Sequence, residues 1–266
     1  MTTPSRRRDM ASVVGIPLTV AIVVGAQLLE GGSLRTLLQP TAALVVFGGT
    51  LAALLVSFPM DVMRATVRAV RRSFDPVPEP DQQLVIRLSE YAMRARRKGI
   101  GALESEIDEV DDPFLSLAIE LATDGFRVQE VRRLLETDSQ TREDQDEQPA
   151  DVLEAAAGYA PTLGILGAVL GLIHVMENLA EPGKLGAGIA VAFVATVYGV
   201  GSANLLFLPL ATKVRARSRA QALGREVIIE AMAAIQQNQH PRLVEQHLTA
   251  FLRTRRAQKS VKGVAA

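Results

Sequence analysis

The hydrophobic pattern of the sequence is dominated by four long stretches that contain no acidic or basic residue apart from one histidine. They cover residues 10–29, 36–60, 155–176 and 185–212. About 20 helical residues, at 1.5 Å each, cross a bilayer core of roughly 30 Å. The pattern therefore predicts an all-α integral membrane protein, with four transmembrane helices in two hairpins separated by a helical cytoplasmic domain. The predicted spans are about residues 10–29, 38–60, 155–176 and 185–210.

Helix signals also fill the polar segment between the second and third spans. Apolar residues recur every three or four positions from Leu84 to Ala95, which predicts a helix ending at Gly99. A second helix is predicted from Asp112, a capping residue followed by Pro113, to a stop at Gly125.

The remaining polar segments give weaker helix signals. The segment "VQEVRRLLET" predicts a short helix, and "DSQTREDQDEQP" after it is a linker or a solvated helical extension. The fourth span is expected to continue as a cytoplasmic helix, and a short final helix should run from Pro241 through Phe251. Three prolines should break the chain after the second span: Pro76, Pro78 and Pro80.

The basic residues predict the orientation in the membrane. Of the 29 lysines and arginines, only Arg35 and Lys184 lie in the two short loops that would face outward. Both termini and the central segment should therefore be cytoplasmic in a multi-pass membrane protein. The first span is longer than a signal-peptide core of about 7–15 residues, so we expect a retained anchor. The predicted divisions are a cytoplasmic N-terminus (1–9), a first hairpin (10–60), a cytoplasmic domain (61–154), a second hairpin (155–212) and a cytoplasmic tail (213–266).

Small residues mark one face of the third span. Gly164, Gly167 and Gly171 are three and four positions apart, and Gly199 gives the fourth span a similar character. Membrane helices associate through close packing at such residues. The face is compatible with simple helix packing or with close packing around a moving or ion-bearing partner helix.

Two prolines lie within the last two spans, toward the predicted cytoplasmic side. Pro161 and Pro209 each remove a backbone hydrogen bond and can kink a helix. Such prolines are compatible with a hinge, but prolines are also ordinary in membrane helices.

The predicted spans contain no aspartate or glutamate. Proton carriers and many cation transporters place such a group within the membrane, so a cation-coupled function would need a carboxylate from another chain. The polar groups that remain in the last two spans could hydrate a pathway. The chain has no cysteine, and we find no hydrolase triad, nucleotide loop or metal cluster, so we expect a protein that is not an enzyme and holds no metal or cofactor.

Three segments carry a resemblance to a known family. "GYAPTLGILGAVLGLIHVM" and "LGAGIAVAFVATVYGVGSANLLFLPLATKVR" resemble the third and fourth membrane helices of MotA-type flagellar stator proteins. "LLEGGSLRTLLQPTAALVVFGGTLAALLVSFP" resembles their first hairpin. The family includes MotA, MotC and PomA forms and is related to TolQ and ExbB.

The resemblance implies roles for four residues of the second hairpin, which lines the ion channel in this family. Pro161 and Pro209 match prolines associated with conformational change during ion flow, and Thr196 matches a threonine near the ion path. Sodium-type members usually carry a second threonine where this chain has Ala168. The translocated ion is therefore expected to be a proton, with sodium as the alternative.

The resemblance also implies two kinds of partner. The family pattern that contacts the switch protein of the flagellar rotor falls on Arg96 and Glu104, although both would otherwise be interpreted as a charged helix end. Several copies of such a chain form a ring around a MotB-type protein. This partner has one membrane helix with the ion-binding aspartate and a peptidoglycan-binding domain.

Three other functions stay open from the sequence. An ExbB/TolQ-type energiser of outer-membrane processes is the nearest, but those relatives usually have three spans. A self-contained secondary transporter would need an intramembrane charge that this chain lacks. A structural membrane scaffold would work without an ion gradient.

Overall fold

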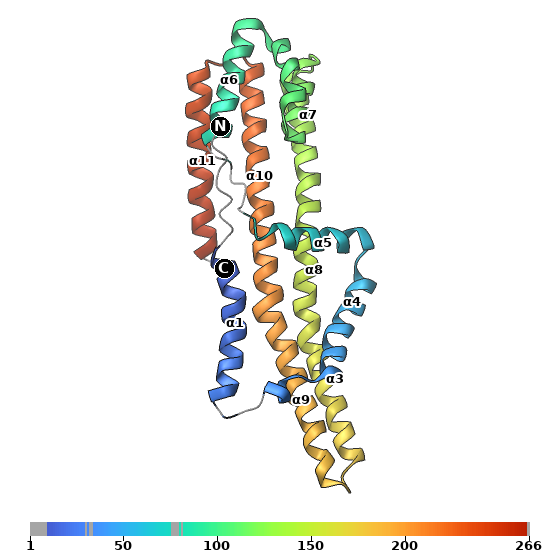
Figure 1. Cartoon of the computed structure of the whole chain (residues 1–266). Coiled ribbons are helices and arrows are strands. Elements are labelled where there is room, and N and C mark those ends of the chain that lie inside the picture. The colour runs from blue at the N-terminus through green and yellow to red at the C-terminus, as the bar shows by residue number, and fades with distance from the viewer. Residues whose placement is uncertain (1–9, 30, 32–33, 76–79, 81, 265–266) are drawn as a thin grey trace. The chain divides into compact units, whose positions relative to one another are not determined.

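The computed structural model describes residues 10–29, 31, 34–75, 80 and 82–264 (Figure 1). Every regular element in these ranges is helical. The chain forms two compact units, which we call the first unit (residues 1–77 and 146–216) and the second unit (residues 78–145 and 217–266). The predicted N-terminal segment 1–9, with Arg6, Arg7 and Arg8, lies outside the described residues, as do Pro76 and Pro78.

The N-terminal part of the first unit begins with a helix that coincides with the first predicted span. The next long helix contains a π-helical turn and covers residues 40–57, so it ends before the predicted residue 60. Phe58 is extended (φ −129°, ψ 143°) because the ring of Pro59 disfavours helical geometry in the residue before it. The elements are α1 (Met10–Leu29), α2 (Leu34–Leu37), α3 (Pro40–Ala43), η1 (Leu44–Gly48), α4 (Gly49–Ser57) and α5 (Met60–Arg72).

The C-terminal part of the first unit is a hairpin of two long helices. The first is α8 (Val128–Glu177), and the second runs through α9 (Pro182–Ser202), the π-helical η3 (Ala203–Phe207) and α10 (Leu208–Gln236). Residues 128–145 of α8 and 217–236 of α10 belong to the second unit. Pro209 has no N–H for the carbonyl four residues before it, and the π-helical turn at η3 contains that carbonyl.

Three helices among the described residues are long and apolar enough to cross a membrane. They are Pro40–Ser57, Val128–Glu177 and Leu185–Gln236. The helix α1 has 20 residues and no charged residue. A small-residue core holds the first unit together where α3 and η1 meet α8 and α9: Ala42, Val46, Ala160, Val194 and Ala195.

The second unit is a helical bundle with a conventional apolar core. Its core includes the fully buried side chains of Leu88, Phe114, Leu135, Met232 and Leu248. Besides the parts of α8 and α10 named above, it contains α6 (Gln82–Lys98), the 3₁₀-helix η2 (Ile100–Glu109), α7 (Pro113–Thr123) and α11 (Pro241–Val264).

Three helix termini in the second unit match the predicted ones: the start and end of α7 and the end of α6. The backbone N–H of Phe114 donates to the Asp112 carboxylate (2.9 Å), which caps α7. Gly99 and Gly125 follow the ends of α6 and α7 with φ of 86° and 83°, conformations that favour glycine.

Two polar segments differ from the simplest interpretation of the sequence. Residues 138–149 are part of α8, so the segment after "VQEVRRLLET" is the helical extension rather than a linker. Asp138 and Arg142, four residues apart, form an ion pair there (2.5 Å). The last helix continues from Pro241 to Val264, beyond the predicted end at Phe251.

Candidate functional site

The two helices of the α8–α9 hairpin are in backbone contact at the predicted glycines. A β-carbon built on Gly164 of α8 would lie 2.9 Å from the carbonyl oxygen of Ala195. One built on Gly199 of α9 would lie 2.5 Å from the carbonyl oxygen of Ala160. Neither position has space for a methyl group, because real β-carbons do not approach backbone so closely.

The contact continues along the hairpin. A β-carbon on Gly167 would lie 2.8 Å from the β-carbon of Ala195, and one on Gly171 would lie 2.8 Å from the backbone nitrogen of Ala192. All four predicted glycines therefore face a helix of their own chain. This arrangement corresponds to simple helix packing, and it leaves none of the four as bare backbone for a partner helix.

Three of the predicted coupling residues lie on or beside this contact. The α-carbon of Pro161 would be 3.1 Å from a β-carbon on Gly199, and the α-carbon of Thr196 would be 3.4 Å from one on Gly164. Ala168 is half-buried and lies one turn beyond Gly164 on α8. Pro209 is not part of this group: it is exposed and lies ten positions beyond Gly199, after the π-helical turn.

The small polar side chains of the hairpin bond to their own helices. The Thr196 hydroxyl donates to the carbonyl of Ala192 (3.4 Å), and the Thr162 hydroxyl donates to that of Tyr159 (2.7 Å). Ser202 and Asn204 make equivalent bonds to Gly199 and Val200. These local bonds satisfy the groups without a partner chain, as is usual in a membrane helix.

Two tyrosines connect the hairpin to the N-terminal helices, and their structural roles were not predicted. The Tyr198 hydroxyl donates to the carbonyl of Leu37, and its ring centroid is 5.7 Å from that of Phe47. The hydroxyl groups of Tyr159 and Ser57 are 3.0 Å apart. A tyrosine in an otherwise apolar span indicates a hydrogen-bond partner in general, but the sequence does not identify that partner.

An arginine of α10 joins two carboxylates of α8. Arg215 forms ion pairs with Glu154 and with Asp151 (3.0 Å), and its side chain is 25% exposed. The hydrogen bond to Glu154 raises the pKa of Arg215 above its ordinary value. The pairing of Glu154 with Arg215, 61 residues away, has no local signal in the sequence.

The two predicted rotor-contact residues differ in their surroundings. Arg96, near the end of α6, donates a hydrogen bond to the carbonyl of Asn238 (2.9 Å), just beyond α10. Glu104 is exposed on η2, and its side chain makes no hydrogen bond or ion pair with another described residue. Of the nearby cations, Arg94 pairs with Glu106, whereas Arg97 and Lys98 are exposed.

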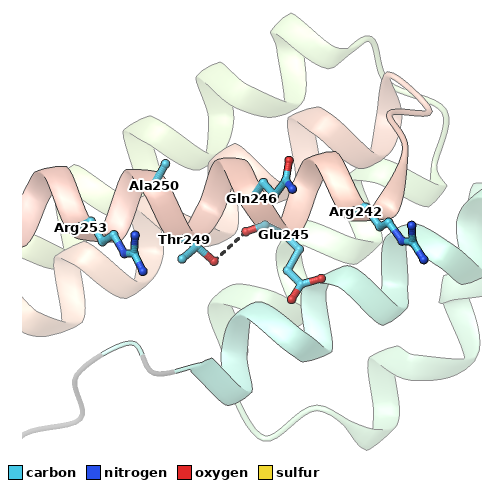
Figure 2. A pocket seen from close by; sticks show the side chains of 6 residues that line it. All are labelled: Arg242, Glu245, Gln246, Thr249, Ala250 and Arg253. Atoms are coloured by element: carbon cyan, nitrogen blue, oxygen red, sulfur yellow. Dashed lines mark hydrogen bonds between the residues drawn. The ribbon is translucent and has the colours of Figure 1, made fainter.

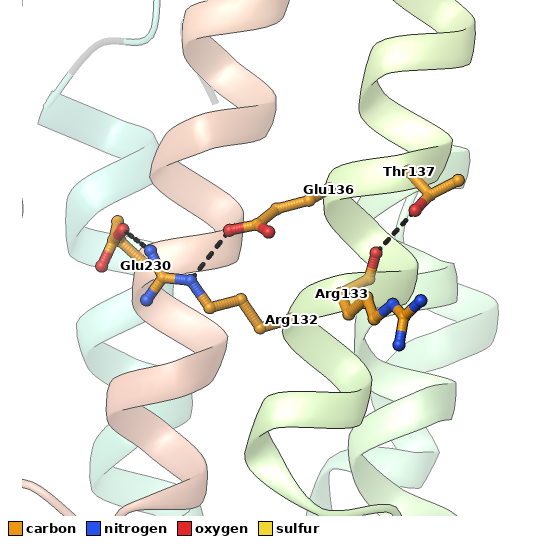
Figure 3. Close-up of polar contacts among 5 residues, drawn as sticks. All are labelled: Arg132, Arg133, Glu136, Thr137 and Glu230. Carbon is orange, nitrogen blue, oxygen red and sulfur yellow. Dashed lines mark hydrogen bonds and ion pairs between the residues drawn. The ribbon is translucent and has the colours of Figure 1, made fainter.

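The second unit also contains a charged network between α8 and α10, shown in Figure 3. Arg132 of α8 bonds Glu136 of the same helix (2.9 Å) and Glu230 of α10. The hydrogen bond to Glu136 raises the pKa of Arg132. Nearby, burial raises the pKa of Glu226, and Arg255, 3.1 Å away, opposes this shift.

A surface hollow of about 450 Å³ lies along α11 (Figure 2). Among its lining residues, the Thr249 hydroxyl donates to the carbonyl of Glu245 (2.8 Å), which is a bond within the helix. No group of three or more histidine or acidic residues suited to a metal ion occurs in the part of the chain that the structure describes. The hollow is lined by Arg242, Glu245, Gln246, Thr249, Ala250 and Arg253.

Comparisons with known proteins agree over nearly the whole chain. Residues 106–227 match the MotA/TolQ/ExbB proton channel family, and residues 13–99 match the motility protein A N-terminal family. Motility protein A of Bacillus subtilis is 35% identical over 92% of this chain and 91% of its own length.

Solved structures give the same result. The structure of C. jejuni MotAB is similar with a TM-score of 0.85 and 29% identity, covering 91% of this chain and 95% of that chain. The flagellar MotAB stator complex from Bacillus subtilis is similar with a TM-score of 0.82 and 33% identity, with the same coverage. The chain therefore belongs to the MotA/TolQ/ExbB proton channel family, and within it to the motility protein A group.

Proposed function

We propose that this chain is the stator subunit of a bacterial flagellar motor, and that it forms a proton channel with a MotB-type partner. The observation that carries this proposal is similarity along 91% of the chain to structures of MotAB complexes. The match of residues 13–99 to the motility protein A N-terminal family favours a flagellar stator over an ExbB/TolQ-type energiser.

The membrane arrangement that fits this function has four spans and multi-pass insertion in the inner membrane. We assign α1 as the first span, since its 20 residues carry no charge, and the three apolar candidate helices as the others. The distribution of basic residues supports cytoplasmic termini and a cytoplasmic segment 61–154. The boundaries between the membrane hairpins and the cytoplasmic segments, at residues 60, 154 and 212, are also part of this proposal.

The titrating group of the channel comes from the partner in this proposal. Residues 155–176 and 185–210 contain no aspartate or glutamate, so the hairpin has no carboxylate to carry a proton across the membrane. A MotB-type partner with a single span would supply an aspartate, and its peptidoglycan-binding domain would anchor the ring of stator subunits. Neither the stator ring nor its proton transfer requires an enzyme active site, a metal or a cofactor.

Conformational coupling is assigned to Pro161 and its surroundings. One charge that crosses 100 mV releases about 2.3 kcal/mol, so a step driven by one proton needs a low barrier. Pro161 leaves the carbonyl of Ala157 without its usual helical donor, which allows α8 to bend where α9 contacts it. Pro209 allows a second bend beside η3, while Thr196 and Ala168 would lie along the proton path.

Contact with the rotor is assigned to Arg96 and Glu104. Both residues are exposed. Exposed ion pairs contribute about 0–1 kcal/mol each, which suits contacts that form and break at every step. The switch protein of the rotor would supply the opposite charges.

Deletion and complementation of the gene test the proposed function. Cells without the chain should assemble flagella that do not rotate, and the wild-type gene should restore swimming that a protonophore abolishes. Liposomes should conduct protons only when the chain is reconstituted with its MotB-type partner. Normal swimming of the deletion strain with a defect in outer-membrane transport would identify an energiser instead. Cation flux through the chain alone would identify a transporter.

A further inference from the structure

The surface of α5 carries a row of arginines whose role is not explained by the stator proposal. Arg64, Arg68 and Arg71 are four and three residues apart, so they share one face of the helix. All three are exposed, and none of their side chains forms an ion pair or hydrogen bond with another residue that the structure describes. Asp61, in the first turn, is the single acidic residue of the helix.

The opposite face of α5 is already occupied within the first unit. Val62 and Met63 pack with Val152 and Ala156 of α8. Ala69 and Val70 pack on a cluster from α8 and α10, so α5 lies across these two helices (Figure 1). This packing fixes the arginine face toward the outside of the unit. The cluster comprises Ala150, Leu153, Leu210, Ala211 and Val214.

Two exposed apolar side chains lie next to the arginines. Met60 and Val67 are each 55% exposed. Each lies four positions before an arginine, Met60 before Arg64 and Val67 before Arg71, so the members of each pair are neighbours on the helix surface. An exposed apolar edge beside a basic stripe is typical of a helix that lies in a membrane interface.

The position of α5 along the chain puts this surface at a membrane boundary. The apolar candidate span Pro40–Ser57 ends two residues before α5, and Phe58 and Pro59 make the turn between them. A helix that starts so close to a span end cannot move far from the lipid headgroups. Guanidinium groups bind phosphate through paired hydrogen bonds, and anionic lipid attracts clustered arginines.

We propose that Arg64, Arg68 and Arg71 bind the phosphate groups of anionic phospholipids in the cytoplasmic leaflet, with Met60 and Val67 inserted at the edge of the acyl region. This inference rests on the membrane orientation proposed above. The surface would concentrate lipids such as phosphatidylglycerol around each stator subunit. It would also hold the inner end of the second span at a fixed depth while α8 bends.

A tryptophan reporter tests the proposal directly, because the chain contains no tryptophan. The variant Val67→Trp places an indole beside the arginines. The full chain, purified with its co-expressed MotB-type partner, would be reconstituted in vesicles of roughly four parts phosphatidylcholine to one part phosphatidylglycerol. Either lipid is brominated in turn, and quenching of the indole by each reports which lipid lies next to it. The complex with an unaltered Val67 gives the background from tryptophans of the partner.

We expect brominated phosphatidylglycerol to quench the indole fluorescence at least about three times as strongly as its fraction of the vesicle lipid would give. This excess quenching should fall as the salt concentration rises. Adding Arg64→Gln, Arg68→Gln and Arg71→Gln should remove the excess. The control adds Arg133→Gln, Arg242→Gln and Arg253→Gln, which change the net charge equally at exposed arginines of the second unit. This control should keep the full excess.

Quenching by both lipids in proportion to their share would overturn the proposal, as would loss of the excess in the control. No quenching by either lipid would mean that a neighbouring copy or a partner covers α5, which also overturns it. Met60→Trp repeats the measurement if Val67→Trp does not fold. Failure here is separate from failure of the stator function, because partner-dependent proton flux is measured in the same vesicles.

Discussion

Gly199 of α9 lies directly against Pro161 of α8: a β-carbon built on the glycine would be 3.1 Å from the α-carbon of the proline. Pro161 leaves α8 without one backbone hydrogen bond, and the residue of α9 that faces it has no side chain. The absent side chain permits backbone contact, and the absent donor permits bending. The two residues together define a place where a change in α8 would alter its packing on α9.

We predict that Gly199→Ala destabilises the hairpin by about 1–3 kcal/mol, because the added methyl group overlaps the carbonyl oxygen of Ala160. Thermal unfolding of the purified chain in detergent would measure the effect. Gly201→Ala is the matched control, since a β-carbon at Gly201 meets nothing within 4 Å and alanine favours the helix by up to about 1 kcal/mol. Equal effects of the two substitutions would show that backbone contact at Gly199 is unimportant.

The hinge assignment is tested with two prolines of the same helix. Pro161→Ala restores a backbone donor in α8, and we expect swimming speed to fall below about a tenth of the wild-type value at equal protein levels. Pro149→Ala makes the same chemical change twelve positions earlier, away from the Gly199 contact, and should leave most of the speed. Undiminished swimming with Pro161→Ala would remove the hinge from the mechanism.

The rotor assignment predicts a separation between stability and motility. Charge reversal by Arg96→Glu or Glu104→Lys should each strongly reduce swimming. Only Arg96→Glu should also lower the melting temperature, because Arg96 donates a hydrogen bond to the Asn238 carbonyl. The corresponding loss in the free energy of unfolding should be about 1 kcal/mol or less. Glu245→Lys, an exposed charge reversal on α11, is the control for both measurements. Normal swimming with both rotor variants would contradict the assignment.

Glu226 gives a prediction with a defined pH dependence. Burial raises the pKa of Glu226, so the folded protein holds this proton more tightly than the unfolded chain does. The contribution of Glu226 to the free energy of unfolding is fully present below the ordinary glutamate pKa of about 4.3. It is lost as the pH rises through the raised pKa of the folded protein. Glu226→Gln should therefore raise the melting temperature near neutral pH, and the difference should shrink on acidification. The gain in the free energy of unfolding should stay below about 1 kcal/mol, since the Glu226 side chain is 40% exposed and pairs with Arg255.

Glu130 is the comparison of opposite sign. Its hydrogen bond from Arg127 (2.6 Å) lowers the pKa of Glu130, so the charged carboxylate stabilises the fold near neutral pH. Glu130→Gln should lower the melting temperature there, and this difference should vanish as pH falls through the lowered pKa. Shifts of the same sign in both variants would show that the two local environments do not govern these titrations.

Local signals in the sequence predicted several helix boundaries. Asp112 with Pro113 fixed the start of α7, and Gly99 and Gly125 marked two helix ends, because each effect acts within one turn. The end of the second apolar helix was predicted too late. Hydropathy favours continuing through Phe58, whereas the ring of Pro59 forces that residue out of helical geometry.

The contacts between distant segments could not be predicted in the same way. The sequence places Gly164, Gly167 and Gly171 on one face, but the spacing does not say which helix covers that face. The pairing of Arg215 with Asp151 and Glu154 joins positions more than 60 residues apart. Such pairs depend on which helices become neighbours, and a pattern within one helix carries no information about that.

The glycine face of α8 is occupied by α9, so a companion helix would meet the other faces of the hairpin. These faces carry bulky apolar side chains, with Ile165, Leu172 and Phe193 each more than half exposed. Side chains of this kind change rotamer within picoseconds to nanoseconds when they are not packed. A companion helix would therefore contact a layer of mobile apolar side chains that can adapt to several orientations, rather than a rigid groove that selects one.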